Sequence, residues 1–283
     1  MDVGELLERY AAGERSFREI ELQGAFLGGA DLSQADLKGS NLSQVNLIGA
    51  SLVRTNLREA NLSGASLQAD LTETNLIATN LTQANLTGAK LSKVSLRASN
   101  LTKANFTAAD LSYALLNEAI LRETNLSRAR MIECSFSRAN LTGAVLMGAN
   151  LQGANLSNAV LIGANLQGAK LTSAILTGVN ASGADASDAD FSRANLSGST
   201  LTNINLQGAN LRAARISWTS LRGANLTKAK LFRAELCWSN LTGATLVDAI
   251  LIDANLDETN FEHADLTRAI MPNEGPDEEI GKR

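Results

Sequence analysis

A five-residue period is the feature of this sequence that most restricts its fold. Residues 139–171 read AN-LTGAV-LMGAN-LQGAN-LSNAV-LIGAN-LQGAK-L, with a leucine at every fifth position and an alanine two positions before each leucine. This period matches neither the roughly 3.6-residue repeat of a helix nor the two-residue repeat of a strand. It predicts a repeat architecture in which one small unit is stacked many times along an axis.

The tandem units have the form A(D/N)LXX, and in this they resemble the pentapeptide-repeat family. The resemblance implies an all-β fold, the right-handed quadrilateral β-helix, in which four pentapeptides form one coil of roughly 20 residues. It also implies that the central leucine and the small residue two positions before it point inward. The other three residues of each unit would face solvent.

The repeat frame defines a long central segment and a tail. Large apolar centres recur every fifth residue from Phe17 to Leu67, slip by one residue near Gln68, and continue to Met271. These fifty-two centres predict a β-helix of about thirteen coils over residues 17–271. We expect the acidic tail, 272–283, to be disordered because its prolines end the repeat. The tail has no apolar helix to join two copies, so we expect a monomer.

Residues 1–16 are expected to cap the N-terminal end of the β-helix. An open end exposes the core and an unpaired edge, and both need covering. Asp2 and Glu5 suit the start of a short helix over residues 2–12. Four apolar residues would share one face of this helix: Val3, Leu6, Leu7 and Tyr10.

The residues that usually carry catalysis or bind cofactors and metals are scarce. His263 is the single histidine, and the glycine-rich phosphate motifs and CxxC are absent, so we expect no enzyme, cofactor or metal. Cys134 takes an inward position and Cys237 an outward one, so we expect no disulfide. The start of the chain does not resemble a signal peptide and no apolar run is long enough to span a membrane, which favours the cytoplasm.

Residues that are 20 apart should lie directly above one another in a four-unit coil. Asn85, Asn105 and Asn125 recur at this spacing and are expected to form side-chain ladders between coils. The same arithmetic predicts that Trp218 and Trp238 stack on the outside of the β-helix.

Seven outward residues near the C-terminal end are the candidate partner-binding residues: Arg212, Arg215, Trp218, Lys230, Phe232, Arg233 and Trp238. Exposed tryptophan and arginine are typical of the residues that dominate binding at protein interfaces. Arginine also attracts aromatic rings through cation–π contacts. A second interpretation stays open, in which the rings only shield outer edges and Arg215 forms an ordinary surface pair with Glu235.

The charge distribution bears on a second function that the resemblance raises. Some pentapeptide-repeat proteins protect DNA gyrase, and an acidic rod that mimics DNA is their proposed mechanism. The whole chain has a formal net charge of −4, but residues 22–256 contain fifteen acidic and nineteen basic residues. This slightly positive body is a poor mimic of DNA, and its charge is too sparse to predict direct nucleic-acid binding.

The two ends of the chain narrow the resemblance. The opening MDVGELLERYAAGERSF and the closing RAIMPNEG resemble cyanobacterial members of the family that regulate heterocyst differentiation. This resemblance implies binding to a regulatory protein, the master regulator HetR. We therefore expect a non-enzymatic protein-interaction scaffold. The alternatives are a DNA-mimic gyrase-binding protein and a structural repeat protein of unknown role.

Overall fold

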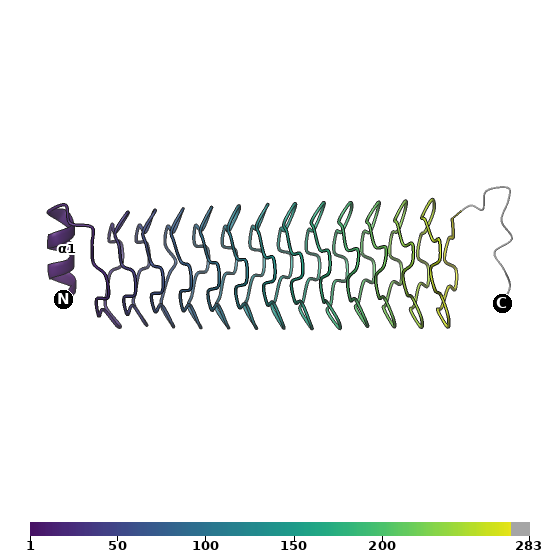
Figure 1. Cartoon of the computed structure of the whole chain (residues 1–283), viewed down its shortest axis with the longest axis horizontal. Helices are drawn as coiled ribbons and strands as arrows, with labels where there is room; N and C mark the ends of the chain where they lie inside the picture. Colours follow the sequence, from purple (N-terminus) through teal and green to yellow (C-terminus); the bar gives the residue numbers. More distant parts are fainter. Residues whose placement is uncertain (273–283) are drawn as a thin grey trace.

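The computed structural model describes residues 1–272, which form an elongated rod of stacked coils with one helix at the N-terminal end (Figure 1). Successive coils are joined by single-residue parallel bridges between residues 20 apart, as between Asn105 and Asn125. Across the frame slip the separation falls to 19, as between Ser51 and Asp70. The β-helix class is therefore confirmed, but with one-residue bridges in place of extended strands, because turns occupy two of every five residues.

Every backbone N–H of the unit from Asn125 to Ala129 finds an acceptor. Asn125 donates to Ala104 O in the previous coil, and Leu126 and Arg128 donate to the next coil, at 2.7–3.0 Å. Ala129 N donates to Leu126 O at 3.1 Å and so closes a turn. The remaining donor, Ser127 N, reaches the side chain Oδ1 of Asn125 at 3.0 Å. This unit thus leaves no backbone donor unpaired, as buried backbone requires.

The expected side-chain ladder of Asn85, Asn105 and Asn125 was wrong, because these side chains cap turns. Asn85 Oδ1 and Asn105 Oδ1 each accept from the N–H two residues ahead, at 3.1 and 3.0 Å, and so cap the turn of their own unit. The turn donor would otherwise lack a partner, and this local need outweighs stacking with the next coil. Side-chain ladders do occur in places, for example where Asn225 Nδ2 donates to Asn205 Oδ1 at 3.1 Å.

The second turn residue of every unit except the one at the frame slip adopts a positive φ, as in a type II turn. Glycine occupies this position in many units because it has no Cβ to clash there. Where another residue takes it, none is β-branched. Trp218 and Trp238 hold this position, with φ of 61° and 60°, so each projects outward from a corner of its coil.

The core is a continuous column of central residues and small residues, such as Leu146 and Ala144, which are fully buried. Where the small inward position carries a hydroxyl, that group donates to a carbonyl of the previous coil. For example, Thr124 Oγ1 donates to Leu101 O at 2.7 Å. Cys134 is also inside, where burial raises the pKa of its thiol to about 12. Both cysteines are free, as expected.

Helix α1 (Val3–Ala11) covers the N-terminal end of the rod. The carboxylate of Asp2 accepts a hydrogen bond from a first-turn N–H at 2.9 Å. Leu6 is fully buried, and Val3 and Tyr10 are partly buried against the core. The expectation for Leu7 was wrong: its side chain is exposed. Leu7 lies roughly 100° around the helix from Leu6 and falls outside the covered stripe.

Two features are absent from residues 1–272. No helix there is both long and apolar enough to cross a bilayer. The same residues contain no group of three histidine, cysteine, aspartate or glutamate side chains placed to hold a metal ion. The tail expected to be disordered, 272–283, lies outside the described residues except for Pro272.

Candidate partner-binding surface

Six of the seven candidate residues lie on two neighbouring corners of the rod and on the side between them, and Lys230 lies on the adjoining side, next to the corner that carries Phe232. We call them the aromatic–arginine surface: Arg212, Arg215, Trp218, Lys230, Phe232, Arg233 and Trp238. One corner carries Arg212, Phe232 and Arg233, which are turn residues of two successive coils. The next corner carries the two tryptophans. The structure therefore brings together the residues that sequence spacing had grouped.

Trp218 and Trp238 form a parallel stack, as their spacing of 20 predicts. Their ring centroids are 5.2 Å apart and their planes differ by 6°. Trp218 N donates to Cys237 O at 3.0 Å, which fixes the two turns relative to each other. The side chains are nevertheless 66% and 52% exposed. The stack is thus a rigid apolar surface presented to solvent.

Phe232 contacts two guanidinium groups on the adjacent corner. The Cζ atoms of Arg212 and Arg233 are 5.1 and 4.8 Å from the centroid of its ring. Arg233 Nε also contacts Asp253 Oδ2 at 3.3 Å, which leaves its cation partly neutralised. Cation–π contacts at such exposed sites contribute about 0.5–1 kcal/mol each, so they orient the arginines more than they stabilise the fold.

The side between the corners carries one ion pair. Arg215 Nε contacts Glu235 Oε2 at 3.3 Å, and both side chains are more than half exposed. Such a pair contributes little stability. This fits the alternative interpretation, in which Arg215 and Glu235 form an ordinary surface pair. Within residues 1–272, Arg212 and Lys230 have no ion-pair partner, so the surface keeps an excess of positive charge.

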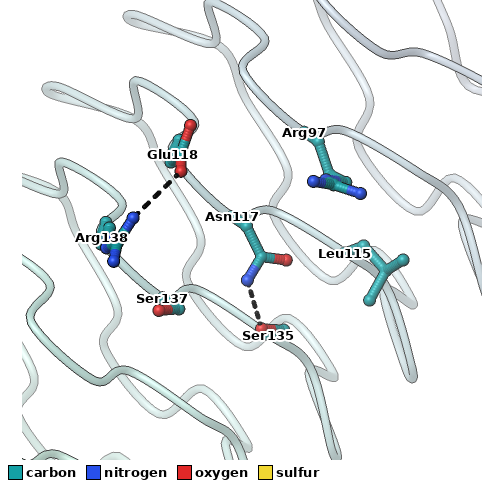
Figure 2. Close-up of a pocket in the computed structure, with 7 residues that line it drawn as sticks. All are labelled: Arg97, Leu115, Asn117, Glu118, Ser135, Ser137 and Arg138. Carbon is teal, nitrogen blue, oxygen red and sulfur yellow. Dashed lines mark hydrogen bonds and ion pairs between the residues drawn. The ribbon is translucent and has the colours of Figure 1, made fainter.

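A polar depression of about 450 Å³ was not identified from the sequence (Figure 2). It is lined by side chains from three successive coils: Arg97, Leu115, Asn117, Glu118, Ser135, Ser137 and Arg138. Asn117 Nδ2 donates to Ser135 Oγ at 2.8 Å, and Arg138 Nη1 contacts Glu118 Oε1 at 3.6 Å. Arg97 approaches from the preceding coil, on the far side of Asn117 from this pair (Figure 2).

The depression lies on the same side of the rod as the aromatic–arginine surface. Glu118 and Trp218 are 100 residues apart, which is five steps of 20 in one column of stacked turn residues. The 20-residue register could have revealed that the depression and the tryptophans share this side.

Sequence reasoning also missed Phe26. Its side chain is 71% exposed at the position where most units carry asparagine or aspartate.

Comparisons with known proteins agree with this architecture. The family described as pentapeptide repeats (8 copies) matches overlapping segments over residues 16–227 and 229–268. The chain is similar to HetL, a pentapeptide-repeat protein involved in heterocyst differentiation regulation from the cyanobacterium Nostoc sp. strain PCC 7120. The two are 33% identical, with 96% of this chain and 98% of HetL covered and a TM-score of 0.21.

Two further solved structures share the repeat. A pentapeptide-repeat protein of the Arabidopsis thaliana thylakoid lumen is 32% identical, with 35% of this chain and 70% of that protein covered and a TM-score of 0.34. QnrB1, a plasmid-mediated fluoroquinolone resistance protein, is 20% identical over 66% of this chain and 86% of its own, with a TM-score of 0.34. A comparison with curated proteins gave no match. The family match, which extends over most of the sequence, shows that this chain belongs to the pentapeptide-repeat family.

Proposed function

We propose that this chain is a non-enzymatic scaffold that binds a regulatory protein through its aromatic–arginine surface. The observation that carries the proposal is the exposed, parallel stack of Trp218 and Trp238 beside the arginine-flanked ring of Phe232. These are the chain's two tryptophans, and both lie outside the core.

The geometry favours binding for two physical reasons. Exposed tryptophan and arginine are the side chains that most often dominate the affinity of protein interfaces. Their positions are also fixed before binding, because Trp218 and Trp238 extend from hydrogen-bonded turns and stack on each other. Less side-chain freedom is then lost on association, and more of the buried apolar area contributes to affinity.

The proposed biological role follows from the similarity to HetL, which is involved in heterocyst differentiation regulation. We propose a related role for this chain, with the transcription regulator HetR as its partner. It would act in the cytoplasm as a monomer. The proposed scaffold is right-handed and has about thirteen coils.

The DNA-mimic alternative has no observation in its favour on this surface. A mimic of DNA needs a run of negative charge, whereas the aromatic–arginine surface carries three arginines and a lysine. The likeness to QnrB1, at 20% identity, concerns the fold alone.

The proposal is tested by measuring binding of purified HetR to the immobilised chain by interferometry. The double variant Trp218→Ala/Trp238→Ala is compared with Met147→Ala/Ile162→Ala, which removes two exposed apolar side chains from the other corners. We expect the tryptophan variant to weaken binding at least about 30-fold, the effect of losing 2 kcal/mol or more. The control should bind within about threefold of the native chain. Equal binding by the native chain and the tryptophan variant would refute the proposal.

A further inference from the structure

One face of the Trp218 ring is uncovered. In its column of stacked turn residues, Trp238 lies on one side of Trp218 and Gly198 on the other. Trp238 instead has Trp218 on one side and Glu258 on the other. The difference in exposure, 66% for Trp218 against 52% for Trp238, agrees with this asymmetry.

The space beside Trp218 forms a slot one coil wide, which we call the Gly198 slot. A methyl group added at Gly198 would meet nothing within 4 Å. One coil further, the side chain of Asn158 leans over Gly178, and its Oδ1 would lie 2.6 Å from a methyl group added there. The slot is therefore bounded by the Trp218 ring on one side and by the Asn158 amide on the other.

The spacing of the coils makes this slot suitable for an aromatic ring. Stacked β-bridges lie about 4.8 Å apart, and the two tryptophan centroids are 5.2 Å apart. A ring held at the level of Gly198 would therefore continue the stack at the same spacing. Offset stacking of aromatic rings occurs at centroid distances of about 4.5–7 Å.

The positive charge around the slot favours an aromatic ring over a guanidinium group as its occupant. Arg193 belongs to the coil of Gly198, and Arg212 and Arg222 flank Trp218 on the neighbouring corners. Among residues 1–272 none of these three arginines has an ion-pair partner. A guanidinium group from a partner would be repelled there, whereas an aromatic side chain next to carboxylates would be attracted.

We propose that the Gly198 slot receives an aromatic side chain of the partner protein, which stacks on Trp218 and is flanked by acidic residues in the partner's sequence. This inference rests on the proposed function, because it specifies what the partner inserts at the aromatic–arginine surface.

The test uses the full chain and the peptide acetyl-Asp-Glu-(3-nitrotyrosine)-Glu-Asp-amide. The only tryptophans of the chain are those of the stack, and nitrotyrosine quenches tryptophan fluorescence by energy transfer, so quenching reports binding near the stack and the variants locate it. Gly198→Gln fills the slot without adding charge or a fluorophore. The chain tolerates glutamine at this turn position, since Gln34, Gln44 and Gln83 adopt the same positive φ.

The matched control is Gly168→Gln, on the corner diagonally opposite, where a methyl group also meets nothing within 4 Å. We expect saturable quenching with the native chain and with Gly168→Gln, and affinity weaker by about threefold to tenfold with Gly198→Gln. A peptide with lysines in place of its acids should bind still more weakly. Equal affinity for Gly198→Gln and the native chain, equal affinity for the two peptides, or no saturable quenching would each overturn the slot.

Binding of HetR to the same variants separates this inference from the proposed function. If Trp218→Ala/Trp238→Ala loses HetR but Gly198→Gln retains both HetR and the peptide, the surface binds its partner and the slot is refuted. If the tryptophan variant retains HetR while Gly198→Gln loses the peptide, the proposed function fails and the slot stands.

Discussion

Replacement of one central leucine tests the five-residue frame on which the whole structure depends. Leu146 is fully buried in the column of central residues, near the middle of the rod. Leu146→Ala removes its packing and leaves a cavity, and because coils above and below hold their own bridges the space cannot collapse. The free energy of unfolding should fall by about 3–4 kcal/mol, within the range measured for buried leucines.

The next residue provides the control. Met147 is a turn residue with 44% of its surface exposed, so Met147→Ala should cost less than about 0.5 kcal/mol. Thermal unfolding followed by circular dichroism should show the melting temperature of Leu146→Ala lowered by about 6–15 °C. The melting temperature of Met147→Ala should stay within about 2 °C of the native value. Equal losses for the two variants would contradict the frame, because adjacent residues would then share one environment.

Two further predictions concern ionisable groups. Burial raises the pKa of Cys134 to about 12. A thiol reagent near pH 8 should therefore titrate Cys237 alone in the native chain and both cysteines after denaturation. Rapid reaction of two thiols in the native chain would contradict the burial of Cys134. The pKa of Asp190 is lowered, because hydrogen bonds from Ser192, Thr172 and Asn210 outweigh the opposing effect of burial. Its stabilisation is therefore present above the unfolded pKa of about 3.9 and lost as pH falls through the folded pKa. Asp190→Asn should reduce the drop in melting temperature between neutral and acidic pH, and an unchanged drop would refute this.

The fold was predictable because the buried positions follow one period throughout. Each central leucine marks a unit, and four units return the chain to the same column, so the stacking of Trp218 on Trp238 followed from counting. The contacts of Arg212 with Phe232 and of Arg215 with Glu235 followed in the same way. Counting in steps of 20 residues identifies which residues stack on one another, and it needs no knowledge of side-chain conformation.

The missed features depend on local geometry that a period does not encode. The role of Asn125 follows from a turn donor that has no backbone acceptor, which becomes visible only when the hydrogen bonds are traced. The polar depression arises where Asn117 and Arg138 bond to other side chains and leave space beside Arg97. Leu7 was misplaced because only a narrow stripe of α1 contacts the first coil.

Side-chain footprinting of the complex shows whether a regulatory protein binds the aromatic–arginine surface. Hydroxyl radicals oxidise exposed tryptophan, phenylalanine and methionine, so oxidation is compared for the chain alone and with HetR bound. We expect protection of Trp218, Trp238 and Phe232, with unchanged oxidation of Met147, which lies on the corner opposite the tryptophans. Protection of Met147 with unchanged oxidation of both tryptophans would contradict binding at this surface.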